Sequence, residues 1–279
     1  MKRTVFFTLV LSFIIIFPSV QISADTTPNY QNYYQQTYIE GTQSGIIKES
    51  YSNFVKQCDI DLAPAYLNFI KGDGNLTFPE FAKENNYDQG SPEETDTQNI
   101  AISSNTKPNS LSTVKSAASK AKIKSGDMLI CHGTNSSGKF LGHEAIATSG
   151  NYVLEMRGPE GAKNNNYHTP ITTFFKNHLK KTGDYIQVYR IKSHPNYSSD
   201  AAKYAYNHMY ISNKINYLTT TNLYHKNPSY CSKYVYLAYW WGTSHKGMKG
   251  GLMWVFPFSM TNVFSGTYKP SYIYKLTTK

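Results

Sequence analysis

Residues 142–156 have the sequence Gly-His-Glu-Ala-Ile-Ala-Thr-Ser-Gly-Asn-Tyr-Val-Leu-Glu-Met, two apolar runs separated by a polar stretch with a glycine. This pattern is typical of a β-hairpin. With residues 149–151 as a three-residue loop, Ala145 lies opposite Glu155. Because strand side chains alternate between faces, this register predicts that His143 and Glu155 share one face. A two-residue loop would place Glu155 on the other face.

A second stretch predicts a helix that begins at a cysteine. Asn227-Pro228-Ser229 resembles a capped loop, and apolar residues follow at helical spacing after Cys231. Cys231 then lies in the first helical turn, where unpaired backbone N–H groups and the helix dipole favour a thiolate. A buried structural cysteine is the alternative interpretation, and the position at a helix start weighs against it.

These two stretches together supply the groups of a thiol enzyme. A thiol nucleophile needs a base, and the base needs a group that orients it. We therefore predict Cys231 as the nucleophile, His143 as the general base and acid, and Glu155 as the orienting carboxylate. Glu144 adjoins His143 but is expected on the opposite face, so it ranks below Glu155. Tyr230, directly before the nucleophile, is a candidate substrate-binding residue.

The other seven histidines carry no comparable argument. His132 follows Cys131 directly, and adjacent strand residues point apart, so this pair is a poor dyad. No histidine pair has metal-ligand spacing with a supporting carboxylate or thiol, so we expect no catalytic metal and no other cofactor. The remaining six are expected at the surface: His168, His178, His194, His208, His225 and His245.

The start of the chain has the pattern of an export signal. Lys2 and Arg3 precede an apolar run over residues 5–18, and Ala24 supplies the small residue of a cleavage site. We therefore assign residues 1–24 to a signal peptide. The mature protein is expected to be soluble and secreted, outside or within the wall of a Gram-positive-like cell.

The rest of the chain divides by composition into three parts. Residues 25–85 are acidic and predict short helices after a poorly ordered start at 25–37, while residues 86–121 have the composition of a linker. Strand-like, aromatic sequence occupies residues 122–279. Residues 72–81 resemble half of a calcium-binding loop, but apolar and basic residues stand at the first ligand positions, so we expect a Gly-rich turn between two helices.

Charge is distributed unevenly along the chain. Residues 25–100 carry a net charge of −8 and residues 101–279 a net charge of +16. A basic extracellular domain suits an anionic wall polymer or an anionic lipid surface, and solubility alone is the other explanation. Nucleic acid is not expected, because Arg157 and Arg190 are the only arginines after the signal. We expect a monomer, and a disulfide between Cys58 and Cys131 stays open.

Four motifs in this order resemble the circularly permuted NlpC-type (YiiX-like) papain-like cysteine hydrolases, over roughly residues 122–265. The resemblance implies an α+β fold with an antiparallel sheet packed on helices, and the same three catalytic residues. The motifs are Ser125-Gly126-Asp127-Met128-Leu129-Ile130, Gly142-His143-Glu144-Ala145-Ile146, Tyr152-Val153-Leu154-Glu155 and Tyr230-Cys231-Ser232-Lys233-Tyr234-Val235.

The resemblance also implies the reaction, hydrolysis of amide bonds and in many relatives those of cell-wall peptides. We therefore expect a secreted thiol hydrolase of peptidoglycan peptides or of another amide. Two alternatives stay open: a lipid amidase or acyltransferase with the same thiol chemistry, and a non-catalytic wall-binding protein or host-surface effector. The glutamate after His143 departs from the small or apolar residue common in relatives, which leaves the substrate open.

Overall fold

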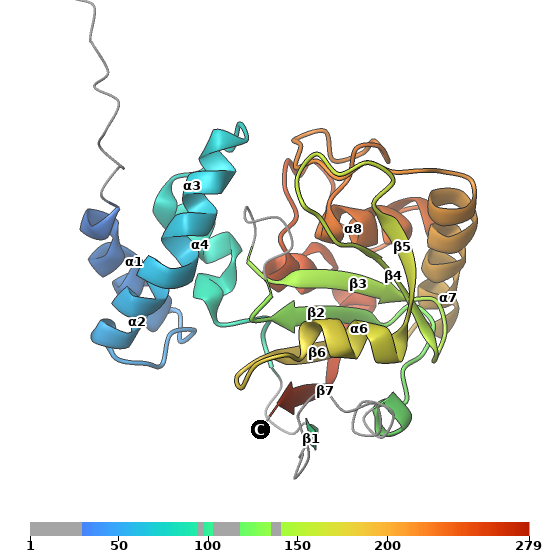
Figure 1. Ribbon diagram of the computed structural model, residues 1–279, viewed down its shortest axis with the longest axis horizontal. Helices are drawn as coiled ribbons and strands as arrows, with labels where there is room; N and C mark the ends of the chain where they lie inside the picture. Colours follow the sequence, from blue (N-terminus) through green and yellow to red (C-terminus); the bar gives the residue numbers. More distant parts are fainter. Residues whose placement is uncertain (1–29, 94–97, 103–117, 135–140, 279) are drawn as a thin grey trace, which may run out of the picture.

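A helical N-terminal region lies beside a seven-stranded sheet in the computed structural model, which describes residues 30–93, 98–102, 118–134 and 141–278 (Figure 1). The helices are α1 (Gln31–Gln43), α2 (Tyr51–Gln57), α3 (Ala63–Lys71), α4 (Phe78–Glu84), α6 (Ile171–His178), α7 (Pro195–Tyr204) and α8 (Cys231–Gly242). Shorter π- and 3₁₀-helical segments are Cys58–Leu62, Asn86–Asp88, Ala205–Ile211, Pro257–Val263 and Gly266–Tyr268. The strands are β1 (Gln98–Ile102), β2 (Met128–His132), β3 (His143–Ala147), β4 (Tyr152–Met156), β5 (Asn166–Pro170), β6 (Tyr185–Arg190) and β7 (Ser271–Thr278).

The strand order in the sheet is β1-β7-β6-β2-β3-β4-β5. All neighbouring strands are antiparallel except β1 and β7, which run parallel at one edge. Helices accompany this sheet rather than alternate with its strands, so the α+β class predicted from the sequence is confirmed.

Both faces of the sheet are covered by helices. On one face Ala145 and neighbouring apolar residues pack with Phe174 of α6, and on the other Ile146 packs into a core that includes Val235 of α8 (Figure 1). Burial on both faces explains why the central strands are nearly continuous apolar runs. It also places α6 and α8, the two helices that reach the catalytic residues predicted above, on opposite sides of the sheet.

The N-terminal helices share a core with the sheet domain. Phe69 of α3 lies with its ring centroid 5.0 Å from that of Trp254, and Phe81 of α4 lies 5.8 Å from Phe256. The expectation of a poorly ordered start was wrong for residues 31–37, which form the first half of α1. Tyr34 anchors that helix, because its ring is buried 5.4 Å from that of Phe78.

Part of the predicted linker, residues 86–121, is bound to the sheet. Ser91 N–H donates to Gln187 Oε1 over 2.9 Å, and Gln187 Nε2 donates to the Ser91 carbonyl over 2.7 Å. Strand β1, also within this range, pairs with β7. Backbone pairing and amide hydrogen bonds hold these residues to the sheet, and such contacts are not visible in composition. The domain boundaries themselves stay predictions.

The glycine-rich stretch after α3 forms a turn between two helices, as predicted. Glu80 lies at the third position of α4, and its carboxylate accepts hydrogen bonds from the Thr77 N–H at 2.8 Å and the Thr77 hydroxyl at 2.7 Å. This is a capping box, which satisfies the free amide at a helix start. Glu80 therefore caps α4 rather than completing a calcium loop.

None of the three cysteines is in a disulfide, and all three are buried. Cys58 lies among the N-terminal helices and Cys131 lies in β2, so the disulfide that the sequence left open is absent. Burial raises the pKa of both thiols, which makes them poor nucleophiles. Within the described part of the chain, no helix is long and apolar enough to cross a membrane.

Candidate active site

The β3–β4 hairpin has the register predicted from its sequence. Ala145 pairs with Glu155 and Ala147 with Val153, and the Thr148 N–H donates to the Tyr152 carbonyl over 2.9 Å. The turn therefore has the three-residue loop that places His143 and Glu155 on one face.

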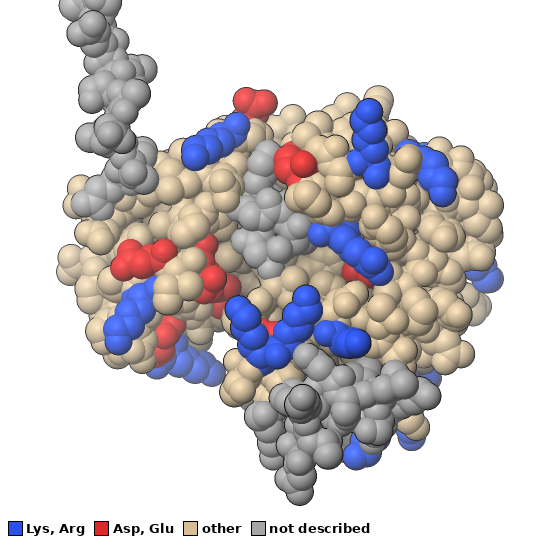
Figure 2. Space-filling view, in the orientation of Figure 1, with Lys and Arg blue, Asp and Glu red and all other residues tan. Residues whose placement is uncertain are grey.

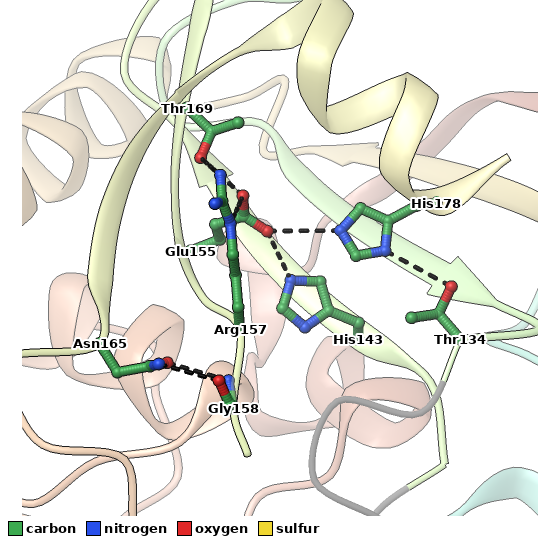
Figure 3. A network of polar contacts seen from close by, with 8 residues as sticks. All are labelled: Thr134, His143, Glu155, Arg157, Gly158, Asn165, Thr169 and His178. Atoms are coloured by element: carbon green, nitrogen blue, oxygen red, sulfur yellow. Dashed lines mark hydrogen bonds and ion pairs between the residues drawn. The ribbon is translucent and has the colours of Figure 1, made fainter. Parts of the chain in front are cut away.

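Two of the predicted catalytic residues meet on that face. His143 Nε2 lies 3.1 Å from Glu155 Oε2, and both side chains are almost fully buried (Figure 3). An ionised carboxylate only accepts hydrogen bonds, so Nε2 of His143 carries the proton in this pair. The ring is thereby fixed in one orientation, with Nδ1 on its other side.

The predicted nucleophile lies against the same imidazole. Cys231 is the first residue of α8, and its thiol lies close enough to His143 to raise the pKa of that imidazole. Since Glu155 takes Nε2, the nitrogen left for the thiol is Nδ1. The Tyr234 N–H, which donates to the Tyr230 carbonyl over 2.8 Å, is the first of the helical hydrogen bonds, so the N–H of Cys231 precedes that ladder. The structure thus brings Cys231, His143 and Glu155 together, with the imidazole of His143 between the thiol and the carboxylate.

The start of α8 is held by buried polar contacts on either side of Cys231. The Ser232 hydroxyl donates to the Val255 carbonyl over 2.7 Å, and Lys233 Nζ donates over 2.7 Å to the Pro228 carbonyl. The Tyr230 hydroxyl accepts from the Val255 N–H over 3.2 Å, and its side chain is completely buried. This location favours a supporting role for Tyr230, and its role in substrate binding stays a prediction.

The charges in this chain stabilise one another. Burial lowers the pKa of His143, but the interactions with Cys231 and Glu155 outweigh it and raise the pKa to about 9. Burial raises the pKa of Glu155, but the hydrogen bonds from His143 and His178 outweigh that and hold it well below its usual range. The arrangement therefore favours a carboxylate beside an imidazolium, which in turn stabilises a thiolate.

His178, predicted to lie at the surface, is part of this site. Its side chain is buried, its Nε2 lies 3.3 Å from Glu155 Oε2, and its ring stacks on His143 with centroids 4.6 Å apart (Figure 3). The sequence held a usable signal: Ile171, Phe174, Phe175 and His178 have the spacing of one inward helix face, and all four are buried in α6.

Glu155 has two further partners that the sequence did not suggest. Arg157 Nε donates to Glu155 Oε1 over 2.9 Å, and the Thr169 hydroxyl donates to the same oxygen over 2.6 Å. Arg157 also donates to Thr169 Oγ1 over 2.7 Å, and its guanidinium lies 4.3 Å from the centre of the Tyr167 ring. Both oxygens of the Glu155 carboxylate are therefore fixed by donors.

Glu144 lies apart from this network. It is fully buried, and neither of its carboxyl oxygens hydrogen bonds within the described residues. Burial, followed by the nearby charge of Cys231, raises the pKa of Glu144 well above its usual value, which favours its neutral form. Glu155 rather than Glu144 bonds to His143, which agrees with the ranking from the hairpin pattern.

Three ligand atoms of the site also have the spacing of a possible metal centre. One atom each of His143, Glu155 and His178 lies within 4.8 Å of the others, which the sequence spacing did not suggest. The hydrogen bonds from both imidazoles to Glu155 account for this convergence without a metal. The expectation of no catalytic metal stays a prediction.

Comparison with known proteins identifies the family. A family described as lipoprotein N-acylation protein LnsA-like matches residues 97–275, and the chain belongs to it. An uncharacterized 30.3 kDa protein of Bacillus thuringiensis is 28% identical over 285 residues, covering 98% of each chain. No solved structure matches.

The family match confirms the coarser part of the interpretation from the sequence. The family is related to papain-like cysteine hydrolases, and its chemistry is that of acyl transfer or amide hydrolysis. The NlpC-type permutation and the roles of the three catalytic residues stay predictions.

Proposed function

We propose that this protein is a thiol-dependent acyltransferase, which moves a fatty acyl group from a lipid ester to the amino group of a peptide. The observation that carries the proposal is the chain Cys231–His143–Glu155, with the cysteine at a helix start. The family description, which names N-acylation of lipoproteins, supports an acyl group as cargo and an amine as acceptor.

The reaction divides into two balanced steps. The Cys231 thiolate attacks the ester carbonyl, a C–S bond forms, the C–O bond breaks, and His143 gives its proton to the departing alkoxide. The acceptor amine then attacks the thioester, a C–N bond forms, the C–S bond breaks, and His143 takes the proton from the amine. The backbone N–H of Cys231, at the first residue of α8, lies where it can stabilise the oxyanion of either tetrahedral intermediate.

Hydrolysis of wall peptides, predicted from the sequence, is the second candidate. The same thiolate can attack an amide, and water in place of the amine then completes hydrolysis. The residues around Cys231 would serve both reactions equally well. The two reactions therefore differ only in their substrates, the acyl donor and the acceptor.

One experiment separates the candidates. Purified protein is incubated with a diacylated lipid that carries a labelled acyl chain, together with a peptide that has a free N-terminal amine, and in parallel with purified cell wall. Labelled amide on the peptide, and a labelled thioester on Cys231 detected by mass spectrometry, are the expected results. Free fatty acid alone, cleaved wall peptides or an unreactive protein would each contradict acyl transfer.

The surface charge suggests where the lipid substrate is met. Among the described residues from 118 to 278, thirteen lysines and Arg157 are exposed, while the only exposed acidic side chain is Asp200, which pairs with Lys203 at 3.4 Å. Basic side chains gather over α6 in Figure 2, and Lys176, Lys180 and Lys181 of that helix and its following turn are exposed. We infer that this face docks on an anionic lipid surface, at the outer side of the membrane if residues 1–24 direct export.

Neutralising that face is expected to weaken binding to anionic vesicles. Replacing Lys176, Lys180 and Lys181 with glutamine removes about 1 kcal/mol of attraction per lysine, or about a hundredfold in affinity together. The measurement is co-sedimentation with vesicles of phosphatidylglycerol and phosphatidylcholine, with phosphatidylcholine alone as the blank.

A matched variant tests whether the face matters beyond its charge. Replacing Lys203, Lys214 and Lys246, which are exposed elsewhere, removes the same charge. A smaller loss is expected for that variant. Equal losses, or binding to anionic wall polymer without binding to vesicles, would contradict the docking face.

A further inference from the structure

A second imidazole shares the carboxylate that orients His143. His178 reaches Glu155 Oε2 from α6, while His143 reaches the same oxygen from β3 (Figure 3). The two rings are nearly parallel, with an interplanar angle of 11°. Thr134 lies on the far side of His178, with its hydroxyl 3.4 Å from Nδ1.

The partners of His178 determine where its proton lies. The Glu155 carboxylate accepts only, so Nε2 of His178 must be the N–H donor toward it. Nδ1 is then free to accept the Thr134 hydroxyl proton, which makes His178 a neutral imidazole with a fixed tautomer. Burial, followed by the charge of His143, lowers the pKa of His178 to about 4, in agreement with the neutral form.

Neutrality matters because the rings are so close. Two imidazolium ions with centroids 4.6 Å apart would repel each other, so the pair holds one proton charge at most near neutral pH. A lysine or arginine in place of His178 would also bind the carboxylate, but it would compete electrostatically with the imidazolium of His143. A neutral donor fixes Glu155 Oε2 and leaves the positive charge on the ring that faces Cys231.

We propose that His178 is a positioning residue, which uses its neutral Nε2–H and its stacked ring to hold Glu155 in line with His143. The inference rests on the proposed thiol chemistry of Cys231. The helix makes the position firm, because Phe174 and Phe175 on the same side of α6 are buried in the sheet core. His178 itself touches neither the thiol nor the acyl group in this role.

Two substitutions separate the donor from the ring. His178→Gln keeps an N–H donor of similar reach and loses the ring, whereas His178→Phe keeps a stacked ring and loses the donor. Charged groups around the pair come from four parts of the fold and are unchanged in both variants: His143 of β3, Glu155 of β4 with Arg157 directly after it, Lys180 after α6, and Cys231 of α8 when ionised.

The readout is the pH at which the Cys231 thiolate forms. Ultraviolet thiolate absorbance is titrated from about pH 4 to about pH 9, with Cys231→Ala subtracted as the blank. We expect His178→Phe to raise the midpoint and lower kcat by about tenfold or more, with KM nearly unchanged, as for other residues that orient a reactive group. For His178→Gln, both the midpoint and kcat are expected to stay close to the wild-type values.

The comparison keeps both ideas testable. Equal behaviour of the glutamine and phenylalanine variants would overturn the role of the donor, and a loss of folding in both would show a structural role alone. If phenylalanine prevents folding, His178→Leu takes its place as the variant without a donor. The titration needs no substrate, so it tests His178 independently of acyl transfer. If the midpoint differs between the wild type and His178→Phe but the wild type shows no acyl transfer, only the proposed function is contradicted.

Discussion

Alanine in place of Cys231 is expected to lower acyl transfer by about a thousandfold or more. The thiol forms and then releases the bond to the acyl group. Cys58 lies among the N-terminal helices, and Cys131, which pairs with His143 across β2 and β3, has a pKa raised by burial, so neither is expected to replace Cys231. The measurement is the initial rate of labelled amide formation, together with the loss of the labelled thioester.

Cys58→Ala is the matched control for this prediction. It removes an equally buried thiol that lies among the N-terminal helices rather than at the start of α8. Its rate is expected to stay close to that of the wild type once the concentration of folded protein is matched. Retained transfer in the Cys231 variant, or equal losses in both, would rule out Cys231 as the nucleophile.

Glu155→Gln is expected to reduce both activity and stability. Glutamine presents an NH₂ group to side chains that donate hydrogen bonds, so at least one of His143, His178, Arg157 and Thr169 loses its acceptor. Removing one member of a buried charged network costs about 3–5 kcal/mol, and the loss of ring orientation costs about a hundredfold in rate. Urea unfolding and initial rates measure the two effects.

The stability difference between wild type and this variant is expected to depend on pH. Interactions with Cys231 and Glu155 raise the pKa of His143 in the folded protein to about 9, above an unfolded value of about 6.5. The contribution of protonated His143 to the free energy of unfolding is then complete below about pH 6.5 and is lost as the pH rises through about 9. The gap between the two proteins should therefore narrow at alkaline pH.

Glu160→Gln provides the comparison for Glu155→Gln. Glu160 accepts from the Thr219 N–H over 2.8 Å and from its hydroxyl over 3.0 Å, in a less buried position away from the imidazoles. Only a small loss of stability and no loss of rate are expected. A Glu155 variant that behaved like the Glu160 variant would contradict the orienting role.

The features predicted correctly from the sequence depend on local rules. The hairpin register follows from a three-residue loop and strand alternation, and the helix start at Cys231 follows from Asn227-Pro228-Ser229 and apolar spacing. Both signals lie within about a dozen residues of the groups they place. No local pattern predicted that Cys231 and His143 lie together. That prediction came from the family resemblance and from the need of a thiol nucleophile for a base.

The features that were missed depend on contacts between distant segments. His178 reaches Glu155 from another element, and its position on the apolar stripe of α6 indicated burial but gave no partner. Strand β1 in the predicted linker is bound by β7, which lies more than 160 residues later in the chain. Helix α1 is polar in sequence, and it forms because Tyr34 packs against Phe78.

Burial of the nucleophile has a consequence for the lifetime of the protein. The side chain of Cys231 has no exposed surface in this structure, although its surroundings favour the thiolate that peroxides attack most readily. A reactive sulfur on an open surface would soon become sulfenic acid and then higher oxides. Enclosed at the start of α8, the sulfur is shielded from dissolved peroxides, so a thiolate there is expected to oxidise more slowly than one on an open surface.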